Sequence, residues 1–356
     1  MYLKKLKTKI SNFFFKKIKV SDEYKDLRIG VIGAGVQGAL LAESVDFYGA
    51  KVVAVHDLNP IKARKLALLY KAKLSTTDLN EFFNVKMDGL LICTVPTARI
   101  EPIKRACEKK IHLLIEKPAS YNLSDGQQCL SLIENANIIS SVGFQLRYEP
   151  RYQRLKQLIK GHSIHLVRTV CTVDYYLNFR MPDWYLKKDS SGGPIAEQAI
   201  HLLDITRFVL GNPKPIKAAS IAIKNMAMDR TEFNAENSIQ LMYELNNGTI
   251  GVHTNHCGHE TSYFDLELIG PHIRLQANAT DKTIYGIING KKINEITPTA
   301  SKPGLNKVNS WLKAIKTGDR NYIKSDYRDS LNTQSLVDAS IKSQKTQKIE
   351  DVAQDL

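Results

Sequence analysis

The segment Ser190–Asp204 carries the residues best suited by type and spacing to acid–base chemistry. It reads SSGGPIAEQAIHLLD, and its Gly-Gly-Pro turn predicts a helix that begins near the proline. On that helix Glu197 and His201 are four residues apart and Asp204 follows three later, so the three side chains would share one face. An exposed ion pair is the simpler interpretation, but the neighbouring residues are apolar and predict a buried helix. We therefore expect His201 to move a proton, Glu197 to orient its ring, and Asp204 to contact a substrate hydroxyl.

Lys117 is the second candidate, because it comes directly after an apolar run. Glu116-Lys117-Pro118 follows Lys110–Ile115, and the proline would fix the turn. Lys117 in this place would hydrogen-bond the reacting oxygen of an alcohol or a ketone, or act as an acid if desolvation lowers its pKa. Taken alone, the tripeptide is more often a surface lysine at the end of a strand.

The elements that would position these residues begin with a glycine-rich turn. Leu27–Ile32 (LRIGVI) has the pattern of a buried strand, and GAGVQG follows it before a helix-forming run. Here the first glycine permits a tight turn, the second lets a diphosphate approach the backbone, and the third lets helix and strand pack closely. Free N–H groups at the start of the helix favour the same anion. We expect a dinucleotide to contact this turn at Gly33, Gly35, Val36, Gln37 and Gly38.

An acidic residue after the next strand indicates which dinucleotide binds. Lys51–His56 (KVVAVH) is followed by Asp57, nineteen residues after Gly38. A carboxylate there would accept hydrogen bonds from the adenosine ribose and repel a 2′-phosphate, which favours NAD as the cofactor. Lys62 and Arg64 lie close enough in the sequence to leave NADP open.

Strands and helices continue to alternate as far as Ile138–Phe144, which predicts an α/β fold with a doubly wound parallel sheet of the Rossmann type. Ligands of such sheets bind at the carboxyl ends of the strands. Two of those ends carry Thr94-Val95-Pro96 and Glu116-Lys117-Pro118. The expected cofactor contacts there are Thr94, Pro96, Glu116 and Lys117.

Length and composition limit the class of protein further. The 356 residues suit two domains, and five widely spaced cysteines argue against a disulfide framework and fit a cytoplasmic protein. Half of the net charge of +14 lies in the first twenty residues, which hold seven lysines and no acid. The remaining charge is spread without a basic block or a base-stacking motif, so we expect no nucleic-acid partner.

Residues 1–24 are predicted to form a basic amphipathic arm. In Met1–Lys19, apolar residues recur near helical spacing with lysines between them. Such a helix would lie on an anionic membrane surface through residues 1–20. Packing on the protein's own body or on a second subunit is the simpler explanation, and both interpretations stay open.

Two further groups of residues allow more than one interpretation. The run HTNHCGHE at residues 253–260 suggests a metal site, but on a strand His253 and His256 would point to opposite faces, so no metal is expected. One of these histidines would instead line the substrate cleft. Trp184 precedes the Gly-Gly-Pro turn and would cover a sugar ring, unless it serves only hydrophobic packing.

Together these motifs resemble the glucose–fructose oxidoreductase / inositol dehydrogenase / MocA (GFO/IDH/MocA) family. The motifs that carry the likeness are VIGAGVQG at Val31–Gly38, EKP at Glu116–Pro118, VGFQLRYEP at Val142–Pro150 and SGGPIAEQAIHLLDITRFVLG at Ser191–Gly211. The resemblance implies a Rossmann domain over residues 25–146 and an α+β domain with a large, mostly antiparallel sheet over residues 147–356. The free face of that sheet would serve homo-oligomer contacts in a dimer or a tetramer.

The resemblance also implies functions for single residues. Lys117 and His201 match the family's catalytic lysine and histidine. Arg147 and Tyr148 match the segment that leads into the substrate cleft, so they join Trp184 and Asp204 as candidate substrate-binding residues.

The chain departs from the family at two positions. Glu197 stands where the family often has aspartate, and Ile100 stands where a histidine is common. We still expect an oxidoreductase that transfers a hydride between NAD and a secondary alcohol or ketone of a sugar, a sugar derivative or a cyclic polyol. The alternatives are a redox-neutral glycoside elimination that uses bound NAD, and an NAD-binding regulatory or scaffold protein without catalysis.

Overall fold

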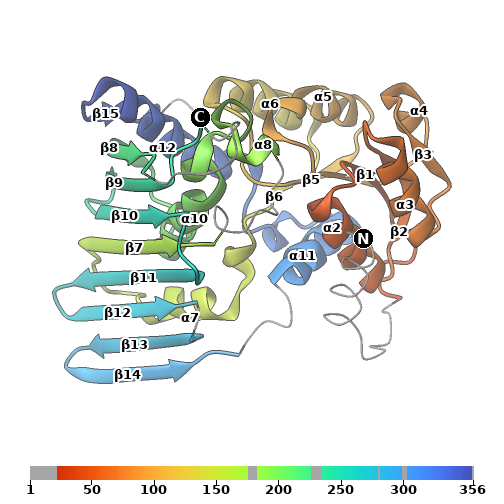
Figure 1. Cartoon of the computed structure of the whole chain (residues 1–356). Helices are drawn as coiled ribbons and strands as arrows, with labels where there is room; N and C mark the ends of the chain where they lie inside the picture. The colour runs from red at the N-terminus through yellow and green to blue at the C-terminus, as the bar shows by residue number, and fades with distance from the viewer. Residues whose placement is uncertain (1–21, 175–182, 226–233, 280, 299–302, 355–356) are drawn as a thin grey trace.

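The structure is a computed structural model that describes residues 22–174, 183–225, 234–279, 281–298 and 303–354. The chain forms two sheets, each accompanied by helices (Figure 1). The basic segment Met1–Lys19 lies outside the described residues. Among the described residues, no helix has the length and apolar character that crossing a membrane requires.

The N-terminal part of the fold is a six-stranded parallel sheet with the strand order β3-β2-β1-β4-β5-β6. The order reverses at β1, so the expected doubly wound Rossmann sheet is confirmed. The strands are β1 (Arg28–Ile32), β2 (Lys51–His56), β3 (Leu74–Thr76), β4 (Gly89–Ile92), β5 (His112–Ile115) and β6 (Ser140–Val142).

Helices cover both faces of this sheet, which explains why its strands are apolar along their whole length. Side chains of α2 and α3 share one apolar cluster with β1, and those of α5 and α6 share another with β4 and β5. Asn59 and Asn122 cap α3 and α6 with their side-chain oxygens. The helices are α2 (Val36–Phe47), α3 (Pro60–Tyr70), α4 (Leu79–Phe83), the 3-10 turn η1 (Pro96–Ala98), α5 (Ile100–Glu108) and α6 (Leu123–Ala136).

The second sheet has nine strands in the order β14-β13-β12-β11-β7-β10-β9-β8-β15. Only β7 and β10 pair in parallel among these strands, which confirms the large, mostly antiparallel sheet. The strands are β7 (Leu166–Thr172), β8 (Pro215–Ile223), β9 (Ser238–Leu245), β10 (Ile250–His256), β11 (Tyr263–Gly270), β12 (Ile273–Asn278), β13 (Thr283–Ile288), β14 (Lys291–Ile296) and β15 (Glu350–Asp351).

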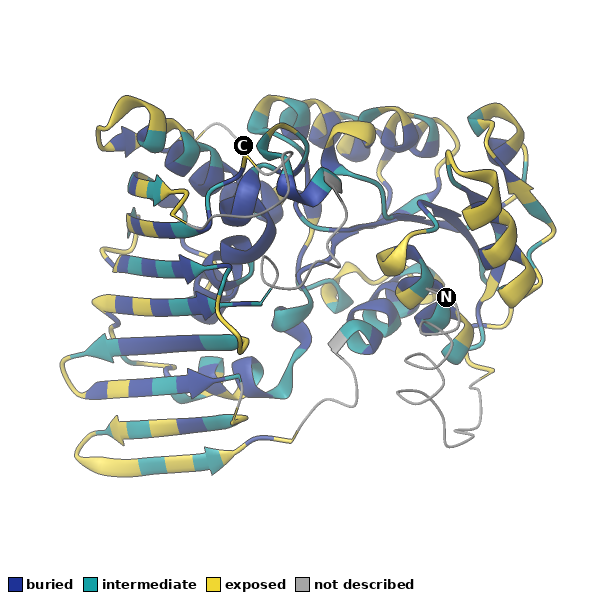
Figure 2. Cartoon of the chain, viewed as in Figure 1, coloured by how far each residue is buried: buried dark blue, intermediate teal, exposed yellow. Residues whose placement is uncertain are grey.

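Helices cover one face of the second sheet. α7 (Pro150–Leu158), α10 (Ile200–Val209) and α12 (Tyr327–Thr346) contact its strands. Figure 2 shows buried and more exposed residues alternating along β7, β9 and β10, as expected when one face of a sheet is covered, whereas β11 is buried along its middle. The short elements are η2 (Gln145–Tyr148), α8 (Asp183–Leu186), α9 (Lys188–Ser191), the π-helical turn η3 (Ile195–Ala199) and the 3-10 turn η4 (Arg320–Tyr322).

The helix α11 (Pro303–Thr317) returns from the second sheet to the first. Its Trp311 is fully buried in the apolar cluster of β1 and α2. A Cβ added at Gly89 would lie 2.6 Å from the Trp311 ring, so β4 has a glycine where this ring packs. Residues from the far end of the chain therefore complete the Rossmann core, although the division at residues 146 and 147 assigned them to the second domain.

Candidate active site

The glycine turn after β1 has the geometry that a bound diphosphate requires. Gly33 has φ +94°, and a Cβ added there would lie 2.7 Å from the backbone of Cys93. A Cβ at Gly38 would lie 1.9 Å from the Gly33 carbonyl oxygen, so the protein's own packing demands both glycines. A Cβ at Gly35 would meet no atom within 4 Å. The space over Gly35 is therefore available to a ligand, which fits the expected function of the second glycine.

The start of α2 adds unpaired donors to this space. Gly35 is the N-cap of α2 and has no side chain that could accept from the first N–H groups. The first turn carries no acidic residue, and Val36 and Gln37 are exposed. An uncapped helix N-terminus beside an open glycine turn favours a phosphate group.

Asp57 lies beside the same turn. One of its carboxylate oxygens accepts from the Ala34 N–H at 2.7 Å, and the other accepts from the Asn59 N–H at 2.8 Å. These bonds hold the carboxylate at the end of β2 and against the glycine turn. Lys62 and Arg64 are exposed on α3.

Thr94 follows β4 on the next strand of the sheet. Its hydroxyl oxygen is buried and has no hydrogen-bond partner among the described residues. Its carbonyl oxygen accepts from the guanidinium of Arg99, with Nη2 at 2.7 Å. A buried hydroxyl without a partner indicates a position where a ligand completes the hydrogen bonding. The open space at Gly35 and this hydroxyl together fit a dinucleotide.

Lys117 and Glu197 meet at the end of β5. Lys117 Nζ lies 2.6 Å from Glu197 Oε2 and 2.9 Å from the Glu197 carbonyl oxygen. The Lys117 side chain is 14% exposed and that of Glu197 is 6% exposed, so water only partly weakens this pair. Sequence reasoning did not predict the contact, because the two residues are eighty positions apart.

The expected pairing of Glu197 with His201 is wrong in this structure. The Glu197 carboxylate contacts Lys117 and lies in the π-helical turn η3, whereas His201 is the second residue of α10, which follows η3 directly. A π-helical turn adds a residue to the helical repeat, so the two side chains do not keep the regular i,i+4 alignment. Such turns often occur at functional sites.

His201 is uncharged near neutral pH. Its pKa lies well below the usual value, because burial disfavours the charged ring and because Lys117 and Lys307 repel it. The neutral imidazole can accept a proton, and it lies in the same site as the amine of Lys117.

Glu116 contacts a lysine from the far end of the chain. Its carboxylate is buried and lies 2.5 Å from the ammonium of Lys307 on α11. Burial alone would raise the pKa of Glu116, but Lys307 holds it below the usual value. Lys307 was missed from the sequence, since one lysine among many in a helix gives no signal.

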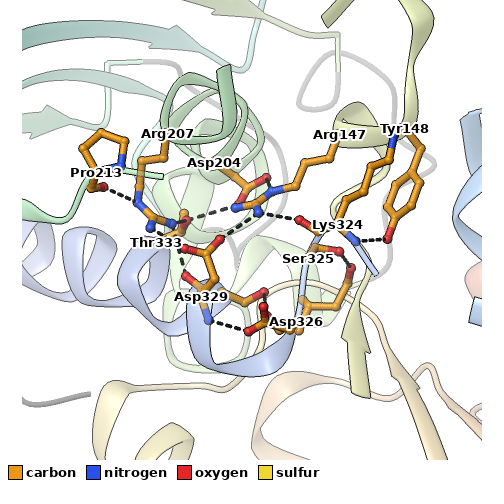
Figure 3. Close-up of polar contacts among 12 residues, drawn as sticks. Arg147, Tyr148, Asp204, Arg207, Pro213, Lys324, Ser325, Asp326, Asp329 and Thr333 are labelled. Atoms are coloured by element: carbon orange, nitrogen blue, oxygen red, sulfur yellow. Dashed lines mark hydrogen bonds and ion pairs between the residues drawn. The ribbon is translucent and has the colours of Figure 1, made fainter. Parts of the chain in front are cut away.

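Arg147 and Asp204 form a buried ion-pair network instead of a substrate surface. Arg147 Nη2 lies 2.5 Å from Asp204 Oδ1, and Arg147 Nη1 lies 2.7 Å from Asp329 Oδ2 (Figure 3). Asp329 also binds Arg207 at 2.7 Å. The side chains of Arg147 and Asp204 are 0% and 1% exposed. Two cations and two anions compensate one another here, so we do not retain Arg147 or Asp204 as substrate contacts.

Tyr148 and Trp184 lie in different surroundings. Tyr148 is buried, and its hydroxyl accepts from the Lys324 N–H at 3.0 Å. Little of its surface is therefore open to a substrate. Trp184 is partly exposed and packs edge-on against Tyr185, with the ring centres 5.7 Å apart. Trp184 therefore keeps a free surface, and its contact with a sugar ring stays a prediction.

The histidines of β10 point to opposite faces, as expected. His253 is buried and its Nδ1 lies 2.8 Å from the Thr169 hydroxyl, whereas the partly exposed His256 has Nδ1 2.9 Å from the Ser238 hydroxyl. Of the two, only His256 has exposed surface that could line a cleft. In the described part of the chain, no three His, Cys, Asp or Glu residues are grouped as a metal would require.

Fold and glycine turn define the class of this chain as a dinucleotide-binding protein of the Rossmann type. Comparison with known proteins gives the family. The model described as "Oxidoreductase family, NAD-binding Rossmann fold" matches residues 27–144, and the GFO/IDH/MocA C-terminal domain matches residues 152–284. The chain belongs to the GFO/IDH/MocA oxidoreductase family, and its Rossmann domain is an NAD-binding one.

Similar proteins include inositol 2-dehydrogenase of Rhizobium meliloti (strain 1021), which is 28% identical over 197 residues, 55% of this chain and 58% of that protein. Myo-inositol 2-dehydrogenase of Thermotoga maritima is 25% identical over 190 residues, 52% of this chain and 55% of its own length. These matches thus span little more than half of the relatives.

A solved structure of levoglucosan dehydrogenase in complex with NADH has a TM-score of 0.82 and 18% identity. That match covers 92% of this chain and 99% of the other. The likeness shows that the two chains share a fold.

Proposed function

We propose that this protein is an NAD(H)-dependent dehydrogenase or reductase that acts on a secondary alcohol or ketone of a sugar, a sugar derivative or a cyclic polyol. The observation that carries the proposal is the 2.6 Å contact between Lys117 Nζ and Glu197 at the carboxyl end of β5, at the same edge of the parallel sheet as the open glycine turn after β1. The names of the relatives, dehydrogenases of inositol and levoglucosan, support the substrate class.

The glycine turn, the N-terminus of α2, Asp57 and the Thr94 hydroxyl would hold the cofactor. When bound, NAD supplies the acceptor for a hydride. The Asp57 carboxylate favours NAD, because its charge would repel the extra phosphate of NADP.

The protein's own residues would handle the oxygen and the proton of the substrate. The Lys117 ammonium donates a hydrogen bond to the substrate oxygen and stabilises negative charge that develops there during oxidation. Glu197 holds the ammonium in place through its carboxylate and carbonyl oxygens. His201, neutral at the working pH, accepts the hydroxyl proton. In the reverse direction the same groups return the proton to a ketone.

The test is turnover of a panel of inositols, anhydrosugars, sugar phosphates and nucleotide sugars, followed by NADH absorbance. We expect Lys117→Met and His201→Ala each to reduce kcat by about a hundredfold or more while NADH binding, measured by fluorescence, persists. Lys104→Met, an exposed lysine on α5, is the matched control and should behave as the unaltered protein does.

Each result of this test has a distinct meaning. Full activity of either site variant would contradict the proposed chemistry. Product formation without net change in NADH would support redox-neutral elimination, and NADH binding without any turnover across the panel would support a regulatory or scaffold protein.

A homo-oligomer is proposed through the open face of the second sheet. Ile221, Met242 and Ile250 on the neighbouring strands β8, β9 and β10 are 66%, 56% and 49% exposed. Ile221 and Met242 also line a hollow of about 550 Å³. Exposed apolar side chains gathered on one face indicate a protein contact. Light scattering should give the mass of a dimer or tetramer, and Met242→Glu should lower it; a monomer at micromolar concentration would refute this.

A further inference from the structure

One buried guanidinium binds the backbone on both sides of Lys117. Arg99 lies between η1 and α5 and is only 3% exposed. Its Nη1 donates to the carbonyl oxygen of Glu116 at 2.5 Å and also to that of Pro118. Its Nε and Nη2 donate to the carbonyl oxygen of Thr94 at 3.2 and 2.7 Å. A single side chain thus joins the ends of β4 and β5.

The bonds of Arg99 all go to main-chain carbonyls and not to a carboxylate. Burying a guanidinium is costly, and only its planar fork of donors could reach three carbonyls from two segments at once. Burial lowers the pKa of Arg99, while the charges of Glu116 and Glu197 act in the opposite direction. Of these two carboxylates, that of Glu197 contacts Lys117 and that of Glu116 contacts Lys307.

The position of these carbonyls determines what Arg99 does. The Glu116 carbonyl belongs to the peptide bond before Lys117, and the Pro118 carbonyl follows Lys117 by one residue. Because Arg99 binds both, it restrains the backbone on either side of Lys117 and so the direction in which the Lys117 side chain leaves that backbone. At its far end the same side chain is held by Glu197. Lys307 differs from Arg99, because it binds the Glu116 carboxylate and not the backbone beside Lys117.

We infer that Arg99 is a positioning residue for Lys117: it fixes the backbone on both sides of the lysine, ties it to Thr94, and so keeps the amine at Glu197. This rests on the proposed function insofar as Lys117 is the residue that contacts the substrate oxygen. Arg99 itself touches neither substrate nor cofactor in this scheme. Small displacements of a reacting group are costly, since a shift of about 1 Å can reduce a rate by about a hundredfold.

The first test needs no substrate. Reductive methylation of the folded protein, followed by peptide mass spectrometry, gives the reaction rate of each lysine amine. In the unaltered protein Lys117 should react slowly, because it is 14% exposed and bound to two oxygens of Glu197. In Arg99→Gln we expect Lys117 alone to react about fivefold faster or more, since its segment opens locally. Arg105→Gln, an arginine on α5 that contacts Glu101 and Asn80, is the matched control.

The second test uses turnover. With a substrate found in the panel, Arg99→Gln should lower kcat by about ten- to a hundredfold with a smaller change in KM, and NADH fluorescence should confirm that the nucleotide site still forms. Arg99→Lys keeps the charge but loses the fork, so its labelling rate and kcat should lie between those of the unaltered protein and Arg99→Gln. Arg99→Lys also serves as the test if Arg99→Gln fails to fold.

The outcomes separate this inference from the proposed function. Labelling of Lys117 as slow as in the unaltered protein, in folded Arg99→Gln or Arg99→Lys, would overturn the inference that Arg99 positions Lys117. An equal rise in the labelling rate of all lysines would also overturn it, because that result indicates a general loss of stability. If the unaltered protein oxidises or reduces nothing in the panel, the proposed function fails while the labelling result still decides the effect of Arg99 on Lys117.

Discussion

Substituting Gly35 and Gly38 by alanine separates cofactor binding from folding. At Gly35 the backbone is extended, with φ −76° and ψ −163°, and an added Cβ meets no atom within 4 Å. Gly35→Ala should therefore change the free energy of unfolding by about 1 kcal/mol or less, because the lower entropy of the unfolded chain and the poorer N-cap act in opposite directions. At Gly38 an added Cβ would lie 1.9 Å from the Gly33 carbonyl oxygen, so Gly38→Ala should cost about 3 kcal/mol or more.

Gly35→Ala should weaken NADH binding although it hardly changes the stability of the protein without NADH. The methyl group of Gly35→Ala would occupy the open space assigned to the diphosphate, and we expect NADH to bind about tenfold more weakly or worse, a loss of about 1.4 kcal/mol. At an NADH concentration of about 100 times the Kd of the unaltered protein, binding stabilises that protein by about 2.7 kcal/mol. A tenfold weaker variant would gain only about 1.4 kcal/mol under the same conditions.

The assay is urea unfolding with and without NADH, together with a fluorescence titration of NADH. The unaltered protein and Gly35→Ala should unfold alike without NADH and differ with it. If Gly35→Ala binds NADH as tightly as the unaltered protein, or loses as much stability as Gly38→Ala does, the space at Gly35 is not a diphosphate site.

Two further predictions concern buried charge. Asp204→Asn should lower the free energy of unfolding by about 3–5 kcal/mol, because Arg147 loses a buried partner. The KM of the folded enzyme should hardly change. A large rise in KM with little loss of stability would restore Asp204 as a substrate contact. Burial lowers the pKa of His253 to about 3, so the unfolded chain binds a proton below about pH 6.5 while the folded chain does not. The free energy of unfolding of the unaltered protein should therefore fall, relative to that of His253→Gln, by about 1.4 kcal/mol for each pH unit from about 6.5 down towards 3. Urea unfolding at several pH values measures this difference. A difference that is independent of pH would refute the prediction.

The sequence predicted the structure best where a feature depends only on residues that are close together in the chain. The GAGVQG turn needs only the strand before it and the helix after it, so the functions of Gly33 and Gly38 followed from their order. The parallel sheet followed from the alternation of apolar strands and helices, and the structure confirms it. The opposite orientations of His253 and His256 followed from the two-residue repeat of a strand.

Sequence reasoning was weaker where one local pattern allows several partners. Glu197 and His201 have the spacing of a helical pair. Glu197, however, lies in a π-helical turn and binds a cation eighty residues earlier in the chain, Lys117. Asp204 was assigned to the substrate for the same reason, because nothing in the sequence indicates that Arg147 binds a residue of this helix.

The sequence by itself determined the class of fold, the dinucleotide turn and the two candidate catalytic side chains, Lys117 and His201, since these depend on local backbone geometry and on motifs that are continuous in the chain. Only the tertiary structure decided how charge is compensated around them: Glu197 holds Lys117, and Lys307 from α11 neutralises Glu116. Burial is the physical reason. A charged group removed from water must find a partner, and the partner is selected by proximity in space, which the order of residues along the chain does not reveal.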